Sequence, residues 1–418
     1  MTLNNNFALN NQGVSNALDT INLPRHRWYY YKEGYSPLLV EKAIEYSRIT
    51  KDDVVLDPFN GSGTTTLTAS MKGYRSIGIE VNPFTAFLSL VKNHNTSIDN
   101  INDLKNEIRY SIKNGDTSPL KGFSTFSKSE KNSKKWLFND SVLDSFEGGW
   151  SYTEGLPSEV KNIFKLALIT AAMKNCNAKR DGKCLRYRRS WVDKSYDNDS
   201  FLTTFEDNLQ IILEDISLSS ISNIPIIING DAREVLQTSV NEKFKLCVTS
   251  PPYLNTFDYT DIYRPELFLG KFVKTQEELY DLRLKTVRSH IQAAWNRPII
   301  DNFGELYNAS IKHVVNHKEE LMDPKIPLMI QAYFEDMLNI LTLLRKKARD
   351  GAQLWIVVSN SAYADKEIPV DLIIGDMAKS AQWKLKEIGV LRNIQRRKTK
   401  HSPNIKTLRE SVIILETL

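Results

Sequence analysis

Short apolar runs rich in valine and isoleucine alternate with helical patterns in two parts of the chain. In the first part, an apolar run at 54–56 precedes a helical pattern over about 64–72, and a second run follows at 74–79. The second part contains five further runs, near positions 226, 244, 353, 385 and 411. Runs of this length, bounded by turn residues, are typical of strands buried between helices. The pattern predicts seven strands and an α/β fold.

Two regions interrupt this alternation. Residues 96–221 combine Lys- and Ser-rich stretches with several helical patterns, which predicts a mainly helical inserted region. Residues 266–328 form a second region without strand–helix alternation. We therefore assign the α/β domain to 25–95 and 222–418. Residues 1–24 are polar and Asn-rich without the apolar core of a secretory signal, so we expect a flexible N-terminus.

Composition narrows the class of protein only slightly. Of the 418 residues, 41% are hydrophobic and 25% are charged, which is ordinary for a soluble globular protein. The net charge of +5 permits a polyanionic partner without requiring one. Cys176, Cys184 and Cys247 form neither a paired framework nor a metal-type cluster, so we predict a reduced, cytosolic protein without a metal site. No run approaches the roughly 18 apolar residues of a membrane span, and we expect no membrane partner.

A glycine-containing turn follows the first predicted strand. The turn reads Asp57-Pro58-Phe59-Asn60-Gly61-Ser62-Gly63-Thr64-Thr65, and Glu80 closes the next strand 23 positions after Asp57. In doubly wound sheets such a turn lets a ligand approach the backbone at a helix N-terminus, and an acid about twenty residues later bonds a ribose diol. The turn lacks the lysine of a phosphate-binding loop. A nucleoside ligand without phosphates is favoured over the alternative, an ordinary turn with a solvated glutamate.

A second loop follows the apolar run 244–248 and reads Thr249-Ser250-Pro251-Pro252-Tyr253. Consecutive prolines fix two φ angles and remove two amide donors, so the loop presents a hydroxyl, free carbonyls and an aromatic face rigidly. The strand near 226 ends in Gly230-Asp231. Asp231 is thereby expected at the carboxyl end of the sheet, where ligands of such folds bind.

Basic residues gather at two places. Tyr187 and Trp191 are interleaved with the first group, which comprises Lys179, Arg180, Lys183, Arg186, Arg188 and Arg189. The second group lies between the last two strands and includes Arg396 and Arg397. Lysine and arginine neutralise phosphates, and arginine also reads guanine edges. We predict nucleic-acid contacts for both groups; a solvated face or a mobile loop is the alternative.

The turn from Asp57 to Thr65 and the loop from Thr249 to Tyr253 resemble two motifs of the amino-methylating DNA methyltransferases. This family methylates N4 of cytosine or N6 of adenine with S-adenosylmethionine. Glu80, Asp231 and the segment 31–44 add to the resemblance, which covers about 1–95 and 222–418. It implies a seven-stranded Rossmann-like methyltransferase sheet, with an antiparallel last strand and a mainly helical inserted region.

The resemblance also implies residue roles. Ser250 and Pro251 would accept hydrogen bonds from the target amine, Pro252 would fix the loop, and Tyr253 would stack on the flipped base. Glu80 would hold the ribose of the donor and Asp231 its adenine amine. The full set implied to bind the cofactor is Tyr31, Ser36, Asp57, Pro58, Phe59, Gly61, Gly63, Thr64, Glu80, Asp231 and Ala232.

The order of motifs implies that 96–221 is the target-recognition region for double-stranded DNA, with 266–328 as its rival. Within the family, serine at position 250 resembles the N4-cytosine enzymes, whereas Asp or Asn is usual for N6-adenine. Because serine also occurs in adenine enzymes, N6-adenine methylation stays an alternative, as do RNA base methylation and an inactive DNA-binding module. A restriction-modification role implies a cognate restriction endonuclease and a cytoplasmic, nucleoid-associated location in a prokaryote or phage-infected cell.

Overall fold

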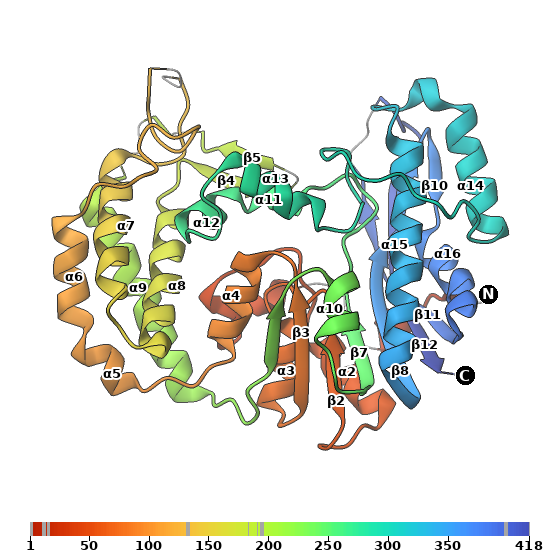
Figure 1. The fold of residues 1–418 in the computed structure, drawn as a ribbon, viewed down its shortest axis with the longest axis horizontal. Coiled ribbons are helices and arrows are strands. Elements are labelled where there is room, and N and C mark those ends of the chain that lie inside the picture. The colour runs from red at the N-terminus through yellow and green to blue at the C-terminus, as the bar shows by residue number, and fades with distance from the viewer. Residues whose placement is uncertain are drawn as a thin grey trace.

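One mixed sheet organises the chain in the computed structural model (Figure 1). The structure describes residues 3–10, 14, 17–130, 134–182, 184–189, 191–192, 196–396 and 400–417. Within these residues the sheet has eight strands in the order β1-β11-β12-β8-β7-β2-β3-β6. Their bounds are β1 (Leu3–Asn4), β2 (Val54–Asp57), β3 (Arg75–Glu80), β6 (Ile226–Asn229), β7 (Phe244–Thr249), β8 (Ala348–Ser359), β11 (Trp383–Gln395) and β12 (Thr407–Thr417).

The seven predicted strands are all present, and the α/β prediction is confirmed. Strands β2, β3, β6, β7 and β8 run parallel to their neighbours in this group, and β12 is antiparallel to both β8 and β11. The parallel strands therefore end at one edge of the sheet, where the loops after β2, β3, β6 and β7 meet.

The eighth strand, β1, comes from the segment that we expected to be flexible. Leu3 and Asn4 pair with β11, and the short helix α1 (Phe7–Asn10) follows. Phe7 is buried and packs edge-on against Trp355, with ring centroids 6.3 Å apart. Gly389 lies directly beneath Phe7, because a Cβ at this glycine would come within 2.4 Å of the ring. These contacts place Leu3, Asn4 and Phe7 against the sheet, and the flexibility expected of 1–24 stays a prediction.

Alternate residues of the central strands face two apolar cores. Val54 and Leu56 face one core together with the helices α10 (Ala232–Thr238), α15 (Ile326–Lys347) and α16 (Val370–Met377). Val55 faces the other core, which is covered by α2 (Pro37–Ser47) and α3 (Thr64–Met71). This period of two places helices on both sides of the sheet.

A separate, mainly helical core lies beside the edge strand β6 (Figure 1). It contains α4 (Pro83–Lys92), α5 (Ile98–Asp103), α6 (Lys105–Asn114), α7 (Asp140–Thr153), α8 (Ser158–Lys174), α9 (Asn198–Leu218) and the hairpin β4 (Ala178–Asp181)–β5 (Cys184–Tyr187). The helices α11 (Tyr259–Ile262), α12 (Arg264–Leu269) and α13 (Gln276–Leu284) join the same core.

Residues 266–328 are consequently shared between two cores. Phe268 and Leu279 pack in the helical core, whereas Tyr307 of α14 (Glu305–Asn316) packs against α15 beside the sheet. The hairpin β9 (Ser361–Tyr363)–β10 (Lys366–Ile368) lies next to α14. Among the described helices, none combines the length and apolarity needed to cross a bilayer.

Candidate active site

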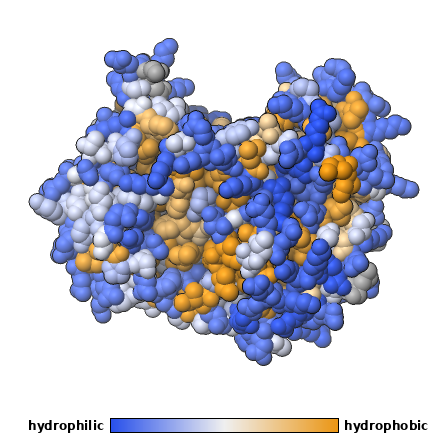
Figure 2. All heavy atoms as spheres, in the orientation of Figure 1, coloured by the Kyte–Doolittle hydropathy of each residue, from blue (hydrophilic) through white to orange (hydrophobic). Residues whose placement is uncertain are grey.

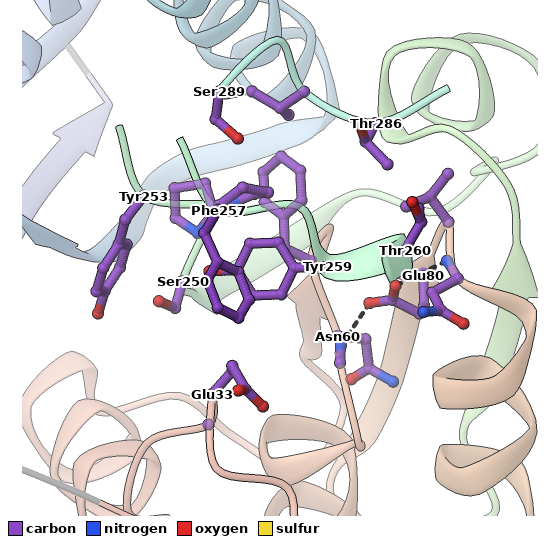
Figure 3. Close-up of a pocket in the computed structure, with 18 of the residues that line it drawn as sticks. Glu33, Asn60, Glu80, Ser250, Tyr253, Phe257, Tyr259, Thr260, Thr286 and Ser289 are labelled. Atoms are coloured by element: carbon purple, nitrogen blue, oxygen red, sulfur yellow. Dashed lines mark hydrogen bonds between the residues drawn. The ribbon is translucent and has the colours of Figure 1, made fainter. Parts of the chain in front are cut away.

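A cavity of about 460 Å³ lies at the carboxyl ends of β2, β3, β6 and β7. The glycine turn and Glu80 form one end, and the Ser250–Tyr253 loop forms the other. Figure 3 shows Glu80 and Asn60 on one side of the cavity, Tyr253 and Ser250 on the opposite side, and Phe257 and Tyr259 between them. The residues predicted to bind the methyl donor and those predicted to bind the target base thus face the same cavity.

The glycine turn needs its two glycines for different contacts. Gly61 has φ +49°, and a Cβ there would lie 3.2 Å from the Tyr31 ring. Gly63 has φ +88° and is the N-cap residue before α3, and a Cβ there would lie 2.4 Å from the Ser89 hydroxyl. A side chain at either position would push the turn away from Tyr31 or Ser89. The turn is therefore shaped for close backbone approach.

Glu80 is placed to receive a diol. One carboxylate oxygen accepts the Gly61 N–H over 2.7 Å and the other accepts the Asn82 N–H over 2.9 Å. Each oxygen retains a further lone pair for a hydroxyl donor. Burial raises the pKa of Glu80 to about 7. With the neighbouring apolar walls of Val81 and Ala232, these two acceptor oxygens fit an adenosine moiety without phosphates.

Three predicted cofactor residues do not line the cavity. Ser36 is fully buried, caps α2 by accepting the Leu38 N–H over 3.2 Å, and donates to Asp19. Gly63 packs on Ser89 behind the turn. Asp57 is 1% exposed and bonds protein groups on both carboxylate oxygens. Gly63 and Asp57 act on the structure of the turn and Ser36 acts on the start of α2, which corrects their assignment as cofactor contacts.

The other eight predicted cofactor residues do line the cavity: Tyr31, Pro58, Phe59, Gly61, Thr64, Glu80, Asp231 and Ala232. Among them Asp231 is heavily engaged. It caps α10 through the Arg233 N–H at 2.9 Å and holds the Arg233 guanidinium at 2.6 Å. Arg233 also pairs with Asp336 at 3.0 Å. A bond from Asp231 to an adenine amine would share this carboxylate with Arg233.

The proline loop is anchored by its polar ends. The Ser250 hydroxyl donates to the Val357 carbonyl over 3.2 Å, so its oxygen lone pairs remain available to accept. The Tyr253 hydroxyl donates to Glu410 over 3.0 Å, and Arg392 holds the other oxygen of Glu410. Ser250, Pro251, Pro252 and Tyr253 all line the cavity.

Several cavity residues escaped the sequence analysis. Asn60 lies inside the glycine motif, and its amide donates to Ser89 over 2.7 Å. Glu33 follows Tyr31 and accepts from the Tyr263 hydroxyl. Their closeness to predicted residues is a signal that could have found them. A further group comes from the second interrupting region and belongs to no motif: Lys285, Thr286, Val287, Ser289 and His290.

The basic residues on and beside the β4–β5 hairpin differ in exposure. Lys179, Arg186 and Arg189 are exposed, and Arg186 pairs with Asp181 at 2.7 Å. The turn residue Gly182 lines the cavity. The hairpin therefore places exposed basic side chains between the helical region and the opening of the cavity.

Two other basic residues of this group, Arg180 and Arg188, bond groups inside the protein. The Arg180 side chain is 17% exposed, forms an ion pair with Glu266 and donates to the Tyr29 hydroxyl over 2.9 Å. Arg188 is half-buried and donates to the Cys176 carbonyl over 3.0 Å. The structure thus removes Arg180 from the predicted DNA contacts, because a buried ion pair leaves its guanidinium no route to a phosphate.

The remaining predicted DNA contacts lie at the chain's less regular segments. Arg396, at the end of the β11–β12 hairpin, donates to the Ser402 carbonyl over 3.0 Å. Lys183 and Arg397 lie outside the residues that the structure describes.

Comparison with known proteins found one matching family model and several relatives. Residues 6–89 match the N6_N4_Mtase family model, described as DNA methylase. The Type II methyltransferase M.BsoBI of Geobacillus stearothermophilus is 28% identical over 405 residues, covering 86% of this chain and 78% of that protein. M.AvaI of Nostoc is 26% identical over 405 residues, with coverage of 88% and 81%. M.MvaI of Kocuria varians is 21% identical over 385 residues, with coverage of 85% and 81%.

The sheet order, the glycine turn and the acid after β3 define a Rossmann-like methyltransferase that uses S-adenosylmethionine as its methyl donor. Together with the family match over residues 6–89 and the similarity to Type II methyltransferases, they support the resemblance to the amino-methylating DNA methyltransferases.

Proposed function

We propose that this enzyme is a site-specific methyltransferase for N4 of cytosine in double-stranded DNA and the modification half of a restriction system. The observation that carries the choice of base is Ser250, which stands where Asp or Asn is usual in N6-adenine enzymes and which lines the cavity. A cognate restriction endonuclease is the partner implied by this role. The reaction would take place in the cytoplasm, at the nucleoid of a prokaryote or of a phage-infected cell.

The proline loop supplies hydrogen-bond acceptors that would make an exocyclic amine a better nucleophile. The amine lone pair is delocalised into the ring, so the amine is a weak nucleophile until acceptors orient its two N–H groups. The Ser250 oxygen and the Pro251 carbonyl are the acceptors, because both belong to the loop that lines the cavity opposite Glu80. Fixed dipoles aimed at the reacting amine act without reorganising during the reaction. Glu80 would hold S-adenosylmethionine, which would supply the methyl group: the sulfur–methyl bond would break as the amine nitrogen bonds the methyl carbon, S-adenosylhomocysteine would leave, and the amine would lose one proton to solvent.

Tyr253 captures the flipped base in this proposal. Its hydroxyl is held by Glu410, so the ring has a defined position at the cavity wall. Stacking of a base on an aromatic ring is worth about 1–3 kcal/mol. That amount offsets much of the few kcal/mol that base flipping costs.

The helical region reads the DNA in this proposal. Lys179, Arg186 and Arg189 are exposed on or beside the β4–β5 hairpin, whose turn reaches the cavity. Figure 2 shows a lower middle surface between two raised, largely hydrophilic parts of the molecule. One raised part includes the described residues between α6 and α7 (115–130 and 134–139), and the other includes α14 (Figure 1). A duplex lying between them would place a flipped base over the cavity.

Mass spectrometry of nucleosides tests the base. Genomic DNA from a host expressing the enzyme should contain N4-methyldeoxycytidine, and sequencing should map it to one recognition site. N6-methyldeoxyadenosine instead would establish the adenine alternative. Transfer of labelled methyl groups to tRNA in preference to duplex DNA would favour the RNA alternative. No incorporation into any DNA, with S-adenosylmethionine still bound, would reject methyl transfer to DNA.

A further inference from the structure

Ser289 places a buried hydroxyl at the wall of the active-site cavity. The residue is 1% exposed, and its hydroxyl has no hydrogen-bond partner among the described residues. Ser289 lines the cavity, and Figure 3 shows its hydroxyl directed inward, on the side opposite Glu33. A buried hydroxyl without a partner costs free energy, and native proteins keep few such groups.

The backbone around Ser289 is held at both ends. The Ser289 carbonyl accepts the Thr256 N–H over 3.0 Å, which ties it to the segment that follows the proline loop. The preceding Arg288 N–H donates to Asp336 of α15 over 2.9 Å, and the Arg288 guanidinium pairs with the same carboxylate at 2.8 Å. Ser289 is thus fixed relative to the acceptor loop, although the two segments are far apart in sequence.

The polar neighbours of Ser289 on this wall are already satisfied. The Thr286 hydroxyl donates to the Arg283 carbonyl over 2.8 Å and lies 3.2 Å from Nε2 of His290. Nδ1 of His290 accepts the Gln292 N–H over 3.4 Å. With Nδ1 as acceptor, Nε2 carries the proton and donates to Thr286. Thr286 and His290 therefore bond other partners, and the Ser289 hydroxyl is left to bond a ligand.

We propose that Ser289 donates a hydrogen bond to the acceptor edge of the flipped base and so helps to determine which base is accepted. This inference rests on the proposed function. Cytosine presents the ring N3 and the O2 carbonyl as acceptors beside its N4 amine. With the amine held by Ser250 and Pro251, a donor on another wall of the cavity would fix the ring in its plane. A site built to bond a polar edge discriminates against bases that leave its donor unpaired.

Two duplexes that differ only at the target position test this contact. One carries the target base and the other an abasic site, and both are titrated against wild type and Ser289→Ala with S-adenosylhomocysteine present. We expect Ser289→Ala to weaken binding of the base-containing duplex about five- to tenfold, the effect of one neutral hydrogen bond. Binding of the abasic duplex should not change. The kcat/KM for methylation should fall by a similar factor.

Ser310→Ala is the matched control, because Ser310 is a buried serine of α14 whose hydroxyl is satisfied by the Leu306 carbonyl at 2.8 Å. Ser310→Ala should change the affinity for neither duplex. Ser289→Cys, which keeps a weak donor of similar size, should fall between wild type and Ser289→Ala. Equal losses on both duplexes, or no loss on either, would overturn the proposal. Because the readout is binding, a wild type that methylates no DNA would reject the proposed function while Ser289 is still tested.

Discussion

The Thr249 hydroxyl donates a 2.6 Å hydrogen bond to the Asp57 carboxylate, which joins the end of β7 to the end of β2. Both residues are buried, and their strands are neighbours in the sheet. Asp57 also accepts the Phe59 N–H at the start of the glycine turn over 3.0 Å. The Tyr35 hydroxyl donates to its other oxygen over 3.0 Å. One carboxylate thereby sets the position of the donor turn relative to the acceptor loop.

Thr249→Val should uncouple the two loops. The substitution keeps the shape but leaves the buried Asp57 carboxylate short of one bond, so the free energy of unfolding should fall by about 1–3 kcal/mol. The single-turnover rate should fall more than the affinity for S-adenosylmethionine, because the defect lies between the two halves of the site. Urea unfolding and rapid-quench kinetics measure the two effects. Thr342→Val is the control, since Thr342 bonds only its own helix at Leu338; equal effects of both variants would reject the coupling.

Glu80 should make cofactor binding depend on pH. Its pKa is raised by burial to about 7, and the ionised form is the one that accepts from both ribose hydroxyls. Affinity for S-adenosylmethionine should therefore rise as pH rises through about 7, and below that pH the Kd should increase by up to tenfold per pH unit. Calorimetry between pH 5.5 and 8.5, on the order of one point per half unit, would measure it. Glu80→Gln should bind weakly with a flat profile; an unchanged slope in this variant would assign the titration elsewhere.

Ser250→Ala should separate chemistry from donor binding. Removing one acceptor for the target amine should lower kcat about 10- to 1,000-fold, as loss of one preorganised group in a dry site does. The Kd for S-adenosylmethionine should stay within about twofold, because Ser250 lies across the cavity from Glu80. Stopped-flow single turnover and calorimetry on the same preparation give the two numbers. Parallel loss of both would mean that Ser250 supports the fold of the loop instead.

The sequence predicted the framework of the site better than its details. The run of Val54, Val55 and Leu56 was enough to predict a strand buried on both faces, and the glycine turn and proline loop marked the two ends of the cavity. Ser36 and Arg180 were misassigned because their partners, Asp19 and Glu266, are brought to them only by the tertiary fold. A local motif shows which residue types are present but not which neighbours satisfy them.

Local sequence patterns also could not predict which hydrophobic core each inserted region joins. Periodicity separated 96–221 from 266–328, yet Phe268 and Phe146 share one helical core. Apolar spacing identifies a buried face without specifying which distant face covers it. Ser289 is the sharpest case, because its place at the cavity depends on Thr256 and Asp336 and on no motif around it.

Tyr253 should act through its ring more than through its hydroxyl. Tyr253→Ala removes the stacking surface, so capture of a flipped base should weaken by about 1–3 kcal/mol. Tyr253→Phe keeps the ring and loses only the bond to Glu410, so its effect should be smaller. A duplex with 2-aminopurine at the target position reports capture, because its fluorescence rises when the base leaves the stack. A full signal with Tyr253→Ala would remove Tyr253 from this role.

The exposed cations of the β4–β5 region should determine the salt dependence of DNA binding. Removing one cation that neutralises a phosphate should reduce the slope of log K against log salt concentration by about 0.9. Lys179→Glu and Arg189→Glu should each show this reduction, whereas Arg186→Glu should show less, because Asp181 already neutralises Arg186. Lys243→Glu is the control, since this exposed lysine precedes β7 at the opposite edge of the sheet from the cavity. If all four variants keep the wild-type slope, the hairpin is only a solvated face and DNA must lie elsewhere.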